Sequence, residues 1–67
     1  MQPHQQRVIT ERTELDDKLQ KLRTFIKGAG NTSVFAELPV EEQVRLKEQA
    51  SYMSLYLQVL DDRIKAF

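Results

Sequence analysis

The sequence predicts an all-α fold: a helical hairpin of two long helices with a short helical turn between them, assembled as a homo-oligomer. Two long segments carry apolar residues at helical spacing, and a glycine-containing turn separates them. The chain has 67 residues and no cysteine, so it is expected to form a single domain (1–67) with a small core and no disulfides. Self-association is the expected source of the missing core.

The first helix is expected over residues 3–27. Pro3 suits its first turn, where the missing N–H costs nothing, and Gly28 suits the position that ends it. Arg12 fills the gap in an apolar stripe whose members follow steps of three and four. These members are Val8, Leu15, Leu19, Leu22 and Ile26. The stripe predicts the face that packs against the second helix.

The connecting segment is expected to contain a turn and then a short helical turn. Two glycines with Asn31, Thr32 and Ser33 predict the turn. Ser33 or Thr32 is expected to cap the helical turn, whose Phe35 and Leu38 would close the open end of the hairpin.

The second long helix is expected from Pro39 to the end of the chain, with two apolar rows along it. The first row has an unbroken alternation of steps of four and three. It comprises Leu46, Ala50, Met53, Leu57, Leu60, Ile64 and Phe67. The second, which we call the outer row, comprises Val44, Tyr52, Leu55 and Val59, together with Tyr56 near the boundary between the two rows. Because a hairpin covers only one face of this helix, the outer row predicts an interface between copies of the chain.

Composition argues against several classes of partner. Ten basic and ten acidic residues give a formal net charge of zero, whereas DNA-binding domains usually carry a basic excess. The sequence has no apolar run near the roughly 20 residues that span a bilayer, and its first ten residues lack the apolar core of a signal peptide. We therefore expect no DNA and no membrane partner, and a cytoplasmic location.

Catalysis, a metal and a cofactor are not expected. The chain has no cysteine, and His4 is the single histidine. The acidic pairs at 16–17 and 61–62 consist of adjacent residues, whose side chains point about 100° apart on a helix and so form no shared carboxylate site. These acids are interpreted as part of a solvated face.

One segment has the chemistry of an anion site. Lys27 precedes Gly28 in a turn that contains further backbone N–H groups and the hydroxyls of Thr32 and Ser33, which together suit a phosphate. The lysine precedes the glycines and no strand leads into them, so the segment is not a Walker A loop. On spacing alone, a simple capped turn is the favoured interpretation and an anion site the alternative.

A family resemblance covers nearly the whole chain. It rests on PHQQRVITERTELDDKLQKLRTFIKG and on the spaced residues that follow, from Phe35 to Phe67. This pattern resembles a family of very small phage-encoded proteins that includes the anti-CBASS cyclic-nucleotide sponges. The resemblance implies a helical homo-oligomer, hexameric in the family, in the cytoplasm of the infected bacterial host. Such proteins bind cyclic di- and trinucleotide messengers of the cGAMP type without cleaving them, and so block CBASS immune signalling.

The resemblance also implies a ligand site between protomers. By position, its residues are Arg12, Lys27, Gly28, Ala29 and Thr32. Where Arg12 stands, a family member can carry an aromatic residue that stacks on a base, and an arginine can also stack on one.

Two questions stay open at this point. For a second, trinucleotide site, Arg63 and Arg45 are the candidates. The alternative function is a small phage protein–protein interaction module that inhibits a host protein through the outer row.

Overall fold

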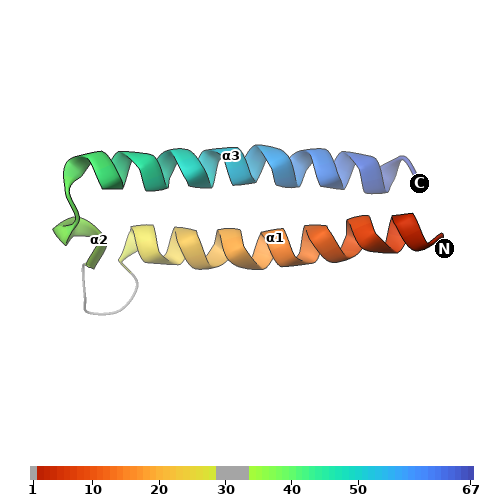
Figure 1. Cartoon of the computed structure of the whole chain (residues 1–67), viewed down its shortest axis with the longest axis horizontal. Helices are drawn as coiled ribbons and strands as arrows, with labels where there is room; N and C mark the ends of the chain where they lie inside the picture. Colours follow the sequence, from red (N-terminus) through yellow and green to blue (C-terminus); the bar gives the residue numbers. More distant parts are fainter. Residues whose placement is uncertain (1, 29–33) are drawn as a thin grey trace.

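The computed structural model describes residues 2–28 and 34–67, and it is a helical hairpin (Figure 1). Helix α1 spans Pro3–Lys27, α2 spans Val34–Glu37 and α3 spans Val40–Lys65; within the described residues all regular structure is helical. α1 and α3 run antiparallel, with the two termini at one end and α2 at the other. The predicted fold class is confirmed.

Local sequence explains both ends of α1. Pro3 lies in the first turn, and the backbone N–H of Gln2 donates to Oε1 of Gln5 at 2.9 Å. At the other end Gly28 adopts φ 70° and ψ 43°, a left-handed conformation that costs glycine little, and its N–H donates to the carbonyl of Phe25 at 3.1 Å. The prediction that Gly28 caps this helix is confirmed.

α2 closes one end of the hairpin through an aromatic contact. The Phe35 ring meets the Phe25 ring edge to face, with centroids 6.0 Å apart, and Phe35 is buried. The side-chain amide of Gln43 on α3 donates to the carbonyls of Leu38 at 2.8 Å and Ala36 at 3.3 Å. These bonds tie the α2–α3 connection to the long helix. The caps predicted at 32 and 33 lie outside the described residues.

α3 begins one residue later than the sequence suggested. Pro39 is extended, at φ −55° and ψ 146°, and precedes the first helical residue. Its carbonyl accepts the N–H groups of Glu42 and Gln43 at 3.0 Å, so it still opens the helix. Arg63 and Lys65 lie in the last turn, where cations favour the negative end of the helix dipole.

The core is a thin seam between the two long helices. The buried apolar side chains of the described residues are Val8, Leu19, Phe35 and Leu60, and of these Leu19 and Leu60 are completely inaccessible to solvent. The radius of gyration is 14.9 Å, against about 11 Å for a compact globule of this length. The hairpin is therefore a rod, and much of its apolar surface lies outside the seam.

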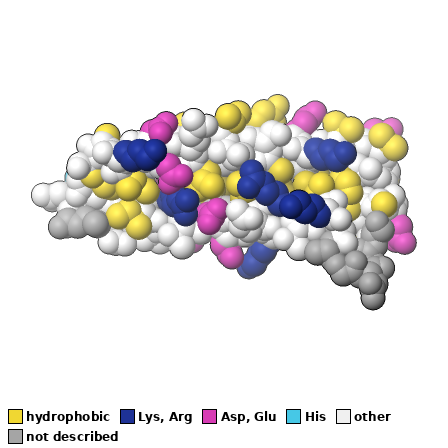
Figure 2. Space-filling view, turned by 180° about the vertical axis from the view of Figure 1, so that it is seen from behind, with side chains coloured by type: hydrophobic (Ala, Val, Ile, Leu, Met, Phe, Trp, Pro, Cys, Tyr) yellow, Lys and Arg dark blue, Asp and Glu magenta, His cyan; other side chains and the backbone are white. Residues whose placement is uncertain are grey.

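The outer row is part of that uncovered surface. Its members are between 44% and 67% exposed, with Tyr52 and Leu55 the most open. Figure 2 shows apolar side chains along the outer edge of α3, away from α1. The prediction that the hairpin leaves this row uncovered is confirmed. Across residues 2–28 and 34–67, neither long helix combines the length and apolarity needed to cross a bilayer.

Candidate functional site

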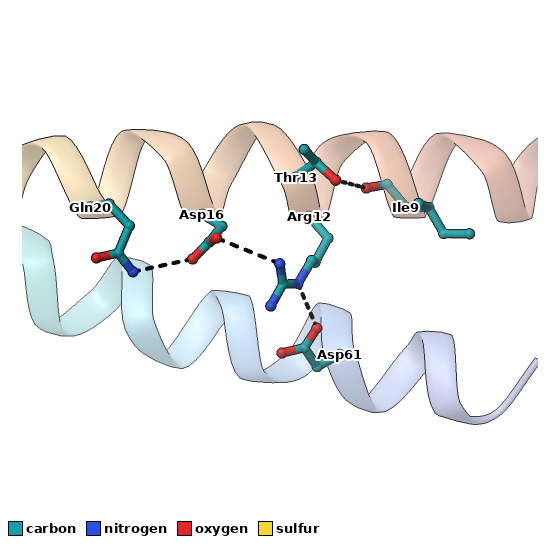
Figure 3. A network of polar contacts seen from close by, with 6 residues as sticks. All are labelled: Ile9, Arg12, Thr13, Asp16, Gln20 and Asp61. Atoms are coloured by element: carbon teal, nitrogen blue, oxygen red, sulfur yellow. Dashed lines mark hydrogen bonds and ion pairs between the residues drawn. The ribbon is translucent and has the colours of Figure 1, made fainter.

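Arg12 lies on the face of α1 that looks toward α3, and it makes an ion pair between the helices (Figure 3). Its Nε donates to Oδ1 of Asp61 at 2.8 Å, and its Nη1 lies 3.6 Å from Oδ2 of Asp16. The hydrogen bond from Arg12 to Asp61, followed by the charge of that carboxylate, raises the pKa of the Arg12 guanidinium. At a position of the stripe where an apolar residue is expected, Arg12 therefore forms an ion pair that joins α1 to α3.

This pairing limits what Arg12 can offer a ligand. Two carboxylates already neutralise the guanidinium, so an incoming phosphate would have to compete with both of them. The planar faces of the guanidinium remain available in a side chain that is 35% exposed. Stacking on a base uses such a face and needs no free charge. Arg12 is therefore better suited to stack on a base than to bind a phosphate.

Sequence reasoning missed the role of Asp61, which it placed on a solvated face. The positions of Arg12 and Asp61 in the sequence did indicate this pairing. Arg12 occupies a stripe position and so must face the second helix, and Asp61 directly follows the buried Leu60. A cation inside one apolar stripe and a carboxylate at the edge of the facing stripe indicate an inter-helix pair.

Lys27 and Gly28 lie at the far end of α1. Lys27 is the last helical residue and is exposed. The N–H of Gly28 is engaged with the Phe25 carbonyl, so Gly28 offers a ligand a close approach to the backbone rather than a free donor. The other two predicted site residues, Ala29 and Thr32, lie outside the described residues.

Arg12 and Lys27 do not meet within one chain. They are fifteen positions apart in one continuous helix (27 − 12), which is about 22 Å along the axis at about 1.5 Å per residue. A small ligand that touches both must therefore take them from different protomers. This is the arrangement that the family resemblance implies.

A groove between α1 and α3 lies beside Lys27. It consists of two adjoining hollows that share Arg23 and Ala50. One, of about 500 Å³, is lined by Arg23, Ile26, Lys27, Lys47 and Ala50. The other, of about 290 Å³, is lined by Arg23, Ala50, Ser51 and Ser54. We call the two together the α1–α3 groove. Figure 2 shows Lys and Arg side chains lying over apolar side chains along the seam.

Ala50 lines both hollows of the groove. Its side chain is smaller than those of Leu46 and Met53, the neighbouring members of the same row, so it fills less of the space beside α1. From the sequence, Ala50 was expected to be an ordinary stripe residue, and no role was expected for Arg23 or Lys47. The sequence did contain a signal for this groove. Ala50 is a single small residue in a row of larger ones, and the end of α1 that carries Arg23 and Lys27 is rich in cations.

Comparison with known proteins decides the family. The Sequestin family model matches residues 2–66. The chain belongs to the Sequestin family. No curated protein and no solved structure matches the chain.

The Sequestin match extends over both long helices and the segment between them, and thus over every residue of the candidate site. It also includes the outer row and the α1–α3 groove. Among the described residues of this Sequestin chain, no three His, Asp or Glu side chains come together in a way that could hold a metal ion. The α1–α3 groove is lined by cations, hydroxyls and apolar side chains, and the outer row is formed by large exposed hydrophobic side chains.

Proposed function

We propose that this Sequestin chain is a phage anti-defence sponge, which binds cyclic di- or trinucleotide messengers of the cGAMP type and holds them without cleaving them. The observation that carries the proposal is the family match over residues 2–66, since the family name denotes sequestering. The resemblance to anti-CBASS proteins supplies the class of ligand. In an infected bacterial cytoplasm, such binding lowers the free messenger and blocks CBASS signalling.

In this proposal, each residue of the site contacts a different part of the ligand. Lys27 supplies a positive charge for a phosphate at the exposed end of α1, and Gly28 allows the ligand close to the backbone. Ala29 and Thr32 belong to the same proposed site. Arg12 of another protomer stacks on a base, because its charge is already met by Asp61 and Asp16.

The proposal includes a homo-oligomer, hexameric as in the resembling family. Two observations support it. Arg12 and Lys27 are too far apart to share a ligand within one chain, and the outer row leaves large apolar side chains exposed on α3. We also propose that the protein acts stoichiometrically and not as an enzyme, in keeping with a sequence that has one histidine and no cysteine.

A thermal-shift screen against cyclic di- and trinucleotides tests the function directly. At about a thousand times the dissociation constant, binding to the folded state alone adds roughly 4 kcal/mol of stability. For a domain of this size, that raises the melting temperature by many degrees. The bound nucleotide should be recovered intact after the protein is denatured. A protein that no member of the panel stabilises, or that releases linear products, contradicts the proposal.

The exposed outer row favours a second candidate function. A side-chain row led by Tyr52 and Leu55, both more than half exposed, also suits docking on a host protein. A docking module is not stabilised by a cyclic nucleotide alone, so the same screen separates the two functions.

A further inference from the structure

We propose that Arg23, Lys27 and Lys47 form a phosphate-binding groove within a single chain, which holds the phosphodiester part of the ligand across α1 and α3. This inference rests on the proposed function for the identity of the ligand. It adds Arg23 and Lys47, from both long helices, to the residues that bind it.

Three cations line the larger hollow of the groove. Arg23 and Lys27 are four residues apart on α1, where like charges repel and weaken a helix. Lys47 lines the same hollow from α3. In the described part of the chain, Arg12, Lys21 and Arg45 each pair with a carboxylate, whereas no ion pair joins Arg23, Lys27 or Lys47 to one. A cluster of cations at one place is relieved when an anion binds between them.

Two of the groove's cations already have contacts that orient them. Arg23 Nη2 donates to Oγ of Ser54 at 3.2 Å, which turns the guanidinium toward α3. Among the described residues this is the one hydrogen bond of that side chain, and a guanidinium has further N–H groups that can donate to a ligand. The ammonium of Lys47 lies 5.8 Å from the centre of the Phe35 ring, within the range of a cation–π contact. Both cations are therefore held beside the groove before a ligand arrives, which lowers the entropy cost of binding.

The larger hollow has the size of a ligand site. Its volume, about 500 Å³, lies within the range of small-ligand sites, about 300–1,000 Å³. Ile26 and Ala50 are the apolar part of its lining, and Arg23, Lys27 and Lys47 are the charged part. A lining that combines apolar side chains with cations suits a nucleotide, which presents both a base or sugar surface and a phosphate.

Four variants test the groove. Arg23→Gln and Lys47→Gln each remove one charge, and each should weaken cyclic dinucleotide binding by about tenfold or more. Ala50→Leu fills the groove without changing any charge and should weaken binding to a similar extent. Lys21→Gln is the matched control: it makes the same charge change two residues from Arg23, on a side chain that is 77% exposed and paired with Asp17. It should bind as the parent does.

Affinity is measured by titration calorimetry at two salt concentrations, with helix content checked by circular dichroism. The two glutamine variants in the groove should show a shallower salt dependence than the parent, which a merely structural role would not produce. The groove proposal is overturned if the parent binds a cyclic dinucleotide and the Arg23, Lys47 and Ala50 variants bind it as tightly as Lys21→Gln does. The sponge proposal stands in that case.

A titration with pyrophosphate tests the groove when no cyclic nucleotide binds. If no cyclic nucleotide binds the parent, the protein is titrated with pyrophosphate and followed by amide chemical shifts. Shift changes that centre on residues 23, 27, 47 and 50 and are lost in Lys47→Gln would support an anion-binding groove. In that case the sponge proposal is refuted and the groove proposal stands. Shifts spread evenly over the surface cations, or no shifts, refute both proposals.

Discussion

At the scale of single residues, Arg12 and Lys27 carry the same formal charge but have different surroundings. Arg12 is bound by Asp61 and Asp16, whereas no carboxylate pairs with Lys27 among the residues that the structure describes. In the candidate site, the charge of Arg12 is therefore engaged in ion pairs that hold the fold together, whereas the charge of Lys27 is available to a ligand. Substitutions at the two positions should consequently have different effects.

Replacing Lys27 should affect binding and leave assembly unchanged. Lys27→Glu puts a negative charge where a phosphate is expected, so most of the ligand-induced thermal shift should vanish. The oligomer should keep its mass, because the side chain is exposed at a helix end. Lys27→Arg retains the charge and should retain most of the shift. If Lys27→Glu binds every ligand in the panel as the parent does, the site is elsewhere and Gly28 is only a cap.

Replacing Asp61 should separate the two roles of Arg12. Asp61→Asn keeps the side-chain shape but removes the charge that holds the guanidinium, so the melting temperature should fall by about a few degrees or less. Anion binding should become tighter, because one competing carboxylate is gone. Arg12→Ala removes the stacking face and should weaken binding by about tenfold. Equal binding by all three proteins would place Arg12 outside the site.

The Arg12 pairing also fixes the direction of its pH dependence. The pKa of Arg12 is raised in the folded state. Its stabilisation is therefore fully present below the unfolded pKa and is lost only as the pH rises through the higher folded value. We expect the contribution of this guanidinium to stay constant through the neutral range in denaturation experiments.

At the scale of the elements, the ends of the helices follow from local chemistry. The left-handed conformation of Gly28 is the clearest case. Gly28→Ala should cost about 1 kcal/mol, since a side chain at positive φ meets the carbonyl that follows it. That loss corresponds to a fall in melting temperature of about 4–8 °C. Gly28→Asn should lose less, because asparagine tolerates this conformation. Equal losses in the two variants would mean that φ is not the cause.

The sequence was sufficient for the long helices and insufficient for the site. Spacing of three and four, with Pro3 in the first turn and Gly28 after the last, predicts α1 with both ends in place. The same spacing after Pro39 predicts α3 to within two residues. Such signals are local. The Arg12–Asp61 pair and the α1–α3 groove depend on the register between helices, which one helix pattern does not specify. Arg23, Lys47 and Ala50 acquire a shared role only when α1 and α3 lie together.

At the scale of the whole molecule, the rod has more apolar surface than its seam can cover. We expect light scattering after size exclusion to give a mass several times 7.9 kDa at micromolar concentration. Leu55→Glu or Val59→Glu should lower that mass or unfold the chain, because the outer row would then bury an unpaired charge. Gln58→Glu adds the same charge at a neighbouring polar and exposed position and should leave the mass unchanged. A folded monomer in the parent protein would contradict the interface.

The hairpin places both ends of the chain at the same end of a rod 46 Å long (Figure 1). The lining residues of the larger hollow lie in the half of the rod nearer α2. A dye, a solid support or a second protein fused to either end is thus held away from the groove. A linker between the last residue of one copy and the first residue of another would likewise be attached at the end of the rod away from α2. Tandem chains of this kind would set the number of copies by covalent connection, so that ligand binding could be measured separately from assembly.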